Sequence, residues 1–350
     1  MPNADTLLSR GKPKEYTLWM NVLQVAAAFS VVLIHASSWL MYAINSNFPM
    51  HLFFAVVCIW AVPVFFMLSG AKLMNYRERY GTKTYFLKRF KKTVIPWAFW
   101  SAVALLIYGS VFDRSILVVL TDYIIGLWHN TLLPMSWFFI PLFGVYLCIP
   151  LVSLLKERRR LLWCVAGALL IFGMVWFNWL RPPSPGNIGD PRFPISGYLG
   201  YAILGYLLNS EKFNRVERTI IYSLGLCGAI YLYVHILLSS LRGGVMNTDL
   251  LSYMTPPLLL MSVGVFVLFR QIQWERLFRG QRSIMVLTQV SACGLGIYLI
   301  HTFLLNAAEY IVPKSMEIPW CVLTAFIVFS VAALLVWVAR KIPVLRAFVS

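Results

Sequence analysis

The fold is decided by the run WMNVLQVAAAFSVVLIH, Trp19 to His35, which is apolar apart from a few isolated polar side chains. A helix needs about 20 apolar residues to cross the hydrocarbon core, because each residue adds about 1.5 Å and the backbone must satisfy its own polar groups. The run extends far enough on both sides to meet this length, and similar runs follow along the chain. The sequence therefore predicts an all-α protein that uses lipid as its solvent.

Composition supports a membrane protein. Of the 350 residues 60% are hydrophobic and only 12% are charged, and the mean hydropathy is +0.74. A soluble globule cannot cover such a chain with polar surface. The net charge of +17 does not indicate nucleic-acid binding, because the basic residues stand between apolar runs rather than on a soluble basic face. The six cysteines lie inside apolar runs without metal-ligand spacing, so we expect no metal site and no disulfide.

About ten segments qualify as transmembrane helices, of which the sixth is the shortest. They lie at about 18–41, 51–72, 93–112, 135–155, 161–180, 194–209, 219–239, 250–269, 284–308 and 318–339. The stretch from Ile116 to Trp128 is apolar but contains Asp122 and is short, so we expect an interfacial or re-entrant segment there.

The distribution of positive charge predicts the topology. With the N-terminus inside, the cytoplasmic segments hold 24 of the 30 basic residues. Lys72 lies at an inner helix end, where its side chain can reach the membrane surface. By the positive-inside rule both termini are cytoplasmic. We expect a cytoplasmic tail at 1–17, one helical bundle at 18–339 and a second cytoplasmic tail at 340–350, with no separate soluble domain.

The titratable groups inside the predicted spans are histidines, because all 13 acidic residues lie outside these spans. The lack of intramembrane carboxylates argues against a proton- or ion-coupled transporter. Gln24 and His35 are eleven residues apart, which places them on one face of the first helix about 16 Å apart. An imidazole at this position can act as a general base toward a hydroxyl, or it can be a packed histidine with a hydrogen-bonded partner.

Two further features are open to two interpretations each. His301 and His35 both lie in the outer halves of their helices, so they could face one pocket, or His301 could be a packed histidine. His51, His129 and His235 lie near the outer boundary, where we expect them to face the interface without a role.

The basic residues Lys88, Arg89, Lys91 and Lys92 could bind the phosphates of an acyl-CoA, or they could bind anionic lipid headgroups.

Six segments along the chain form a recognisable series. The first is Asn21 to His35, and the others are PVFFMLSG (63–70), YFLKRFKKTVIP (85–96), WFFIPLFGVYL (137–147), GYLGYAILGY (197–206) and GLGIYLIH (294–301). In this order they resemble the membrane-bound acyltransferase-3 family. In the first segment that family has Asp, then Arg two residues later, then His eleven residues after the Arg; here Gln24 replaces the Arg and Asn21 the Asp.

The resemblance implies a roughly ten-helix O-acyltransferase that transfers an acyl group, commonly acetyl from acetyl-CoA, and not an aminoacyl group. It has no permanently bound cofactor. The acceptor is a hydroxyl of a cell-envelope or surface glycan, free or lipid-linked, at a bacterial cytoplasmic (inner) membrane. His35 matches the family's catalytic histidine, and Gln24 and His301 are assigned to the substrate pocket. Membrane lipid and envelope glycan assembly proteins are the expected partners.

Two other functions are compatible with the same bundle. One is an exporter or flippase of a glycan or lipid-linked sugar that performs no chemistry, and Gln24 favours it because a charge has been lost. The other is a scaffold for envelope assembly enzymes, which predicts no polar cavity of substrate size. Binding or consumption of acetyl-CoA distinguishes the enzyme from both.

Overall fold

The structure is a computed structural model that describes residues 15–41, 44–109, 114–133, 136–176, 179, 195–311 and 318–349. Most of the predicted N-terminal tail therefore lies outside the described residues. The described part is helical and contains no β-strand, which confirms the all-α class. In chain order the α-helices are α1 (Glu15–Met41), α2 (Phe48–Cys58), α3 (Ala61–Leu73), α4 (Thr82–Arg89), α5 (Ile95–Tyr108), α6 (Ile116–His129), α7 (Phe139–Val152), α8 (Arg159–Val175), α9 (Ile195–Ser210), α10 (Arg215–Gly243), α11 (Pro256–Gln271), α12 (Trp274–Leu277), α13 (Gln281–Ala292), α14 (Gly294–Ile311), α15 (Ile318–Ala339) and α16 (Pro343–Val349).

Each of the ten predicted segments coincides with helix, but not every helix is long enough to cross a membrane alone. Within the described ranges, six helical stretches are long and apolar enough, and α13 with α14, bent by 65°, would make a seventh. The helices α8, α9 and α11 have 17, 16 and 16 residues, below the length of about 20 that a span needs. The count of ten and the side on which the termini lie stay predictions.

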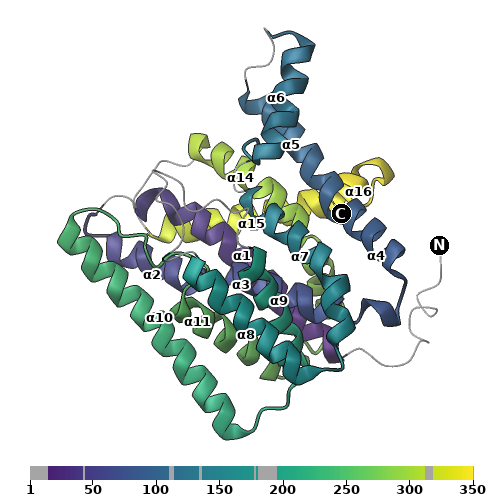
Figure 1. Cartoon of the computed structure of the whole chain (residues 1–350). Helices are drawn as coiled ribbons and strands as arrows, with labels where there is room; N and C mark the ends of the chain where they lie inside the picture. Colours follow the sequence, from purple (N-terminus) through teal and green to yellow (C-terminus); the bar gives the residue numbers. More distant parts are fainter. Residues whose placement is uncertain are drawn as a thin grey trace.

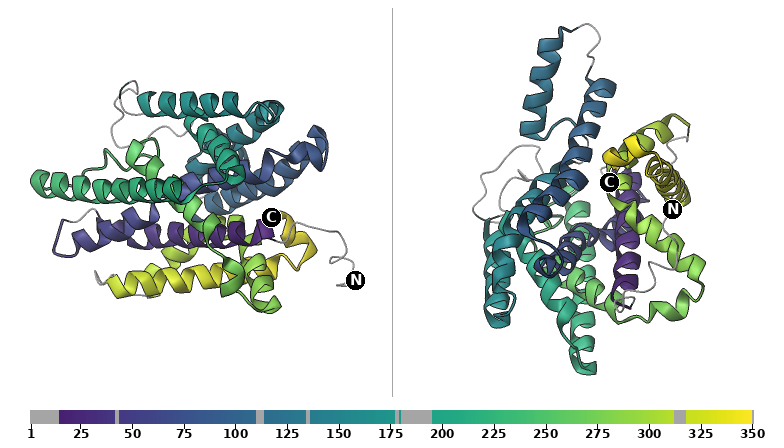
Figure 2. Two further views of the ribbon diagram at one scale, coloured as in Figure 1. Left: turned by 90° about the horizontal axis from the view of Figure 1, so that it is seen from below. Right: turned by 90° about the vertical axis from the view of Figure 1, so that its right-hand side faces the viewer.

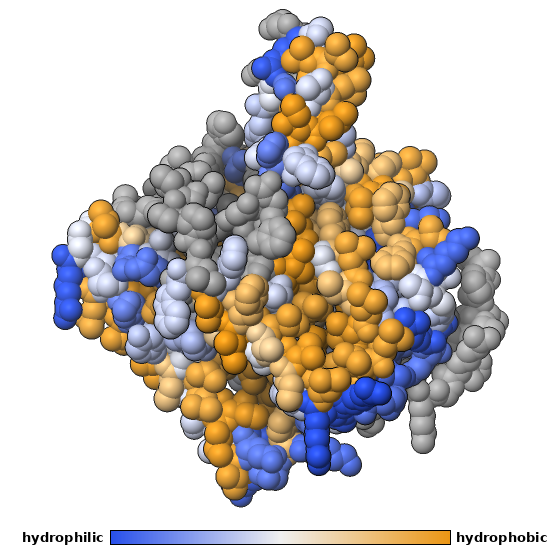
Figure 3. Space-filling view, in the orientation of Figure 1, coloured by the Kyte–Doolittle hydropathy of each residue, from blue (hydrophilic) through white to orange (hydrophobic). Residues whose placement is uncertain are grey.

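The helices α3 and α9 lie at the centre of the bundle and α10 lies along its edge (Figure 1), and α15 forms the lower edge in the left view of Figure 2. Every residue of α9 from Gly197 to Leu208 is buried, whereas only 22% and 28% of the most apolar parts of α10 and α15 are buried. The exposed side chains of α10 are mostly apolar, which is the pattern of a helix in contact with lipid. In Figure 3 hydrophobic surface fills the middle of the face, and hydrophilic residues gather at its lower and right-hand edge and at the left-hand tip.

Glycines let the central helices approach closely, as is usual in membrane bundles. A Cβ atom on Gly70 of α3 would lie 1.7 Å from the backbone oxygen of Ala202 in α9. A Cβ atom on Gly205 of α9 would lie 2.1 Å from the backbone oxygen of Met67 in α3. These two glycines allow backbone to pack directly on backbone between α3 and α9.

The segment predicted to be interfacial or re-entrant forms α6. It packs against α5, where the Tyr123 hydroxyl donates to the Ala98 carbonyl at 2.9 Å. Large apolar side chains of α6 are exposed, among them Ile116 and Trp128. Figures 1 and 2 show α5 and α6 projecting beyond the other helices. Whether α6 lies in the interface stays a prediction.

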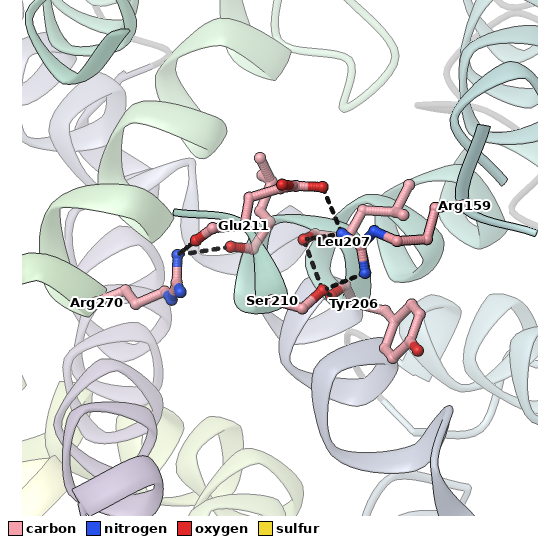
Figure 4. Close-up of polar contacts among 7 residues, drawn as sticks. Arg159, Tyr206, Leu207, Ser210, Glu211 and Arg270 are labelled. Atoms are coloured by element: carbon pink, nitrogen blue, oxygen red, sulfur yellow. Dashed lines mark hydrogen bonds and ion pairs between the residues drawn. The ribbon is translucent and has the colours of Figure 1, made fainter. Parts of the chain in front are cut away.

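Three of the segments predicted to be cytoplasmic, those near residues 78, 156–160 and 211, are bonded to one another, so these three lie at one end of the bundle. Arg77 donates to the Pro150 carbonyl at 3.1 Å, and Lys156 pairs with Glu78 at 2.7 Å. Arg159 lies at the start of α8. Its guanidinium pairs with Glu211 and donates to the Ser210 hydroxyl at the end of α9 (Figure 4). This arrangement is the one that the positive-inside rule requires for these loops.

Arg270 closes the C-terminal end of α9 (Figure 4). Its guanidinium donates to the Leu208 carbonyl at 2.8 Å and to the Glu211 carbonyl at 2.6 Å. The last carbonyls of a helix have no partner within the helix, and a cation near them is favourable. The contact therefore joins α11 to the buried helix α9.

Arg270→Leu is expected to lower the free energy of unfolding by about 2 kcal/mol, because it removes the charged donor from two partly buried carbonyls. Thermal unfolding of the purified protein in detergent measures the effect. The matched control is Arg276→Leu, since Arg276 is exposed in the same region. Equal melting temperatures for the two variants would contradict a stabilising role of Arg270.

Candidate functional site: a histidine pair and an inner polar junction

His35 on α1 and His301 on α14 lie next to each other. Their ring centroids are 5.3 Å apart and the rings are tilted by 34°. His35 is partly buried and His301 is fully buried, so the His35 ring is turned toward the bundle interior rather than toward lipid. At the start of α14, Gly294 lies against α1, where an added Cβ atom would be 3.0 Å from the Gln24 amide nitrogen. The structure thus brings together the two histidines that the sequence places at similar depth.

The tautomer of His301 follows from its partner. Its Nδ1 atom lies 2.6 Å from the Tyr298 carbonyl oxygen, and a carbonyl only accepts hydrogen bonds, so Nδ1 carries the proton. In the uncharged ring Nε2 then has a free lone pair. This Nε2 atom is buried and has no hydrogen-bond partner among the residues that the structure describes. A buried acceptor without a partner is costly and is a candidate binding position for a hydroxyl or an N–H group.

Gln24 lies at a different level of α1 and belongs to a second polar group. Its Nε2 donates to the Ser291 carbonyl at 2.8 Å, close to the bend between α13 and α14. Its Oε1 accepts from the Lys72 ammonium at 2.5 Å. Asn21, one turn earlier, accepts from the Ser291 hydroxyl at 3.1 Å. We call Asn21, Gln24, Lys72 and Ser291 the inner junction; it joins α1, α3 and α13.

The inner junction changes two expectations. Lys72 does not extend to the membrane surface, because its ammonium turns inward to the Gln24 amide oxygen on α1. Gln24 is about three helical turns of α1 from His35, the residue that lies beside His301, so Gln24 and His301 are at different depths in the bundle. Lys72 is not among the site residues predicted from the sequence, although a lone lysine at the end of an apolar run is visible in the sequence and could have indicated it.

The expectation for His51 is wrong. Its side chain is 1% exposed and lies in the core rather than at the interface.

The four basic residues assigned to donor binding lie on α4 and the π-helical turn η3 (Phe90–Val94). The Lys88 ammonium is 3.9 Å from the ring centroid of Tyr80, and the Arg89 guanidinium is 5.6 Å from that of Tyr146. Lys91 and Lys92 are exposed. Such contacts between cations and aromatic faces keep two of the four side chains against the protein.

Two cations from the C-terminal segment join this group. Arg340 and Arg346 lie near enough to Lys92 to act on it electrostatically, together with Lys88 and Arg89. The helix α16, in the predicted tail, packs on α5, where Phe348 stacks on Phe99 with centroids 4.1 Å apart. Within the described ranges none of these cations forms an ion pair with a carboxylate. The cluster therefore keeps its positive charge available for an anionic partner.

The fold and these groups define an integral membrane protein built from helices, with a buried histidine pair inside and an uncompensated cationic surface at one end. Residues 17–339 match a family model described as an acyltransferase domain, acyltransferase-3. Because the match covers nearly the whole chain, the protein belongs to the acyltransferase-3 family and is a membrane acyltransferase. The resemblance seen in the six sequence segments is thereby confirmed. No curated protein and no solved structure matches the chain.

Proposed function

We propose that the protein is an O-acyltransferase that moves an acyl group, acetyl in the simplest case, from cytoplasmic acyl-CoA to a hydroxyl of a cell-envelope glycan. The observation that carries the proposal is the His35–His301 pair, with rings 5.3 Å apart inside an apolar bundle. An uncharged imidazole in such a place can take a proton from an alcohol without needing a neighbouring carboxylate. The proposed location is the bacterial cytoplasmic membrane, where envelope glycans are assembled.

In the proposed reaction His35 accepts the proton of the acceptor hydroxyl. The oxygen attacks the thioester carbonyl carbon, the carbon–sulfur bond breaks, and the CoA thiolate takes the proton from His35. His301 orients the hydroxyl or the His35 ring through its Nε2 lone pair, since Nδ1 is held by the Tyr298 carbonyl. Exclusion of water by the surrounding helices protects the thioester from hydrolysis.

The acyl donor is assigned to the cytoplasmic end of the bundle. Lys88, Arg89, Lys91 and Lys92, together with the two C-terminal arginines, supply positive charge without carboxylate partners in the part of the chain that the structure describes. Acyl-CoA carries several phosphate charges, which such a cluster attracts. The glycan acceptor, free or lipid-linked, enters from the opposite side.

The test is a comparison of surface glycans by mass spectrometry in cells with and without the gene, combined with release of free CoA from acetyl-CoA by the purified protein. We expect the protein-dependent glycans to carry extra acetyl groups, and CoA release to depend on added acceptor. Glycans that disappear from the surface without a change in acetylation, together with no consumption of acetyl-CoA, would support an exporter and overturn the proposal.

A further inference from the structure

Lys72 lies in the last turn of α3, just after the most apolar part of the helical stretch Phe48–Glu78. That most apolar part has a mean hydropathy of 2.5 and is 72% buried. Just before Lys72, Gly70 packs against the α9 backbone, and Leu73 and Met74 just after it are buried. The lysine therefore lies at the end of α3, with packed residues on both sides of it and its own side chain partly buried.

The Lys72 ammonium is bonded to an uncharged amide, while the Arg79 guanidinium donates to the Lys72 backbone carbonyl at 2.6 Å. The hydrogen bond of the ammonium goes to the Gln24 amide oxygen at 2.5 Å, and the Gln24 amide nitrogen is already committed to the Ser291 carbonyl. Among the described residues no carboxylate lies within ion-pairing distance of Lys72. A partly buried cation costs free energy when it has no anionic partner, so a retained one is a candidate ligand-binding group.

The distance along α1 indicates which part of a ligand would reach Lys72. Gln24 lies three helical turns, about 16 Å, from His35 toward the cytoplasmic end. Between its diphosphate and its sulfur, the pantetheine arm of CoA has about as many main-chain bonds as four peptide residues. Four extended residues span ~14 Å, so the extended arm has about this length. A donor with its thioester at His35 therefore has its diphosphate near the level of Lys72.

We infer that the inner junction is a phosphate-binding site, in which Lys72, held by Gln24, binds the diphosphate of the acyl-CoA donor. The inference rests on the proposed function for the identity of the donor. The more exposed cations of Lys88 to Lys92 and the C-terminal arginines then face the adenosine end of the molecule. In this inference the positive charge that binds phosphate comes from Lys72 on α3. Gln24 on α1 is uncharged and holds the Lys72 ammonium through its amide oxygen.

The first test is titration of purified protein with free CoA and with acetyl-pantetheine, which has no phosphate. Lys72→Gln is expected to weaken CoA binding about 10- to 100-fold, the range for losing a charge-assisted hydrogen bond, and to leave acetyl-pantetheine binding unchanged. Lys72→Arg is expected to bind CoA within a few-fold of wild type. The matched control is Lys212→Gln, which removes the same charge from an exposed site at the same end.

Equal CoA affinity in wild type and Lys72→Gln would overturn the inference while leaving the proposed function intact. No binding or consumption of CoA by the wild type would overturn both. A phospholipid headgroup carries the same phosphate chemistry, so the titration is repeated in nanodiscs with and without anionic lipid. A Lys72 effect seen only when anionic lipid is present would assign the site to lipid and overturn the inference.

The second test moves the charge across the 2.5 Å bond between Lys72 and Gln24. Gln24→Arg alone places two cations together and is expected to weaken CoA binding through loss of the native geometry. The double variant Gln24→Arg/Lys72→Gln has one charge again, on α1 instead of α3, and is expected to bind CoA more tightly than either single variant. Additive losses in the double variant would show that the two residues do not share one site.

Discussion

His35→Ala is expected to lower the rate of acyl transfer at least ~100-fold, because positioned general bases contribute about 10²- to 10⁴-fold. The purified variant is assayed for CoA release from acetyl-CoA in the presence of acceptor. The effect is expected in the turnover rate rather than in donor affinity, because His35 is three turns of α1 away from the inner junction. A loss of CoA binding without a loss of rate at saturation would contradict this assignment.

Two further variants separate a chemical role of His35 from a structural one. His129→Ala changes an exposed histidine on α6 and is expected to leave the rate unchanged. His301→Asn keeps a donor that can reach the Tyr298 carbonyl but removes the Nε2 lone pair, and it is expected to lower the rate while the melting temperature stays close to that of wild type. Full activity of correctly folded His35→Ala would remove the residue from the mechanism.

The positions of the helices could be predicted from the sequence, but their integrity as spans could not. Hydropathy finds every apolar segment, yet it does not detect the short turn at residues 59 and 60 that separates α2 from α3 within the helical stretch Phe48–Glu78. It also misses the bend of 65° near Cys293 that divides α13 from α14. Both interruptions occur within continuous apolar sequence, so hydropathy alone does not reveal them. Pro63, which cannot donate to the Ile59 carbonyl, follows the first, and Gly294 lies at the second; helices commonly bend at such residues.

The candidate site was predictable to the extent that it follows helix periodicity. The spacing of Gln24 and His35 correctly places both on the inward face of α1, and the similar depth of His301 anticipates its contact with His35. The partner of Gln24 could not be derived in this way. Lys72 is separated from it by 48 residues, and only the packing of α3 against α1 determines that the lysine turns inward instead of toward the surface. The same holds for Arg340 and Arg346, which reach Lys92 only because α16 folds back onto α5.

Gly205→Ala is expected to damage the fold severely although it adds a single methyl group. The new Cβ would lie 2.1 Å from the backbone oxygen and 2.4 Å from the Cα atom of Met67, so backbone rather than a flexible side chain would have to move. Overpacking of well-packed cores commonly costs about 1–3 kcal/mol, and a clash with backbone exceeds this range. We expect a strongly reduced yield of folded protein and a lower melting temperature in detergent. The matched control is Gly167→Ala on α8, where nothing lies within 4 Å of the added Cβ and where alanine is the better helix former.

The position of this clash also links packing to function. Gly70 on α3 makes the reciprocal contact, at 1.7 Å from the Ala202 oxygen for an added Cβ, and it lies two residues before Lys72. If α3 and α9 are forced apart, α3 must shift relative to α1, and the 2.5 Å hydrogen bond between Lys72 and Gln24 is lost. Any Gly205→Ala protein that still folds is therefore expected to bind CoA as weakly as Lys72→Gln does, while its binding of acetyl-pantetheine changes less. Wild-type stability together with wild-type CoA affinity in Gly205→Ala would show that the close approach of α3 and α9 does not set the position of Lys72.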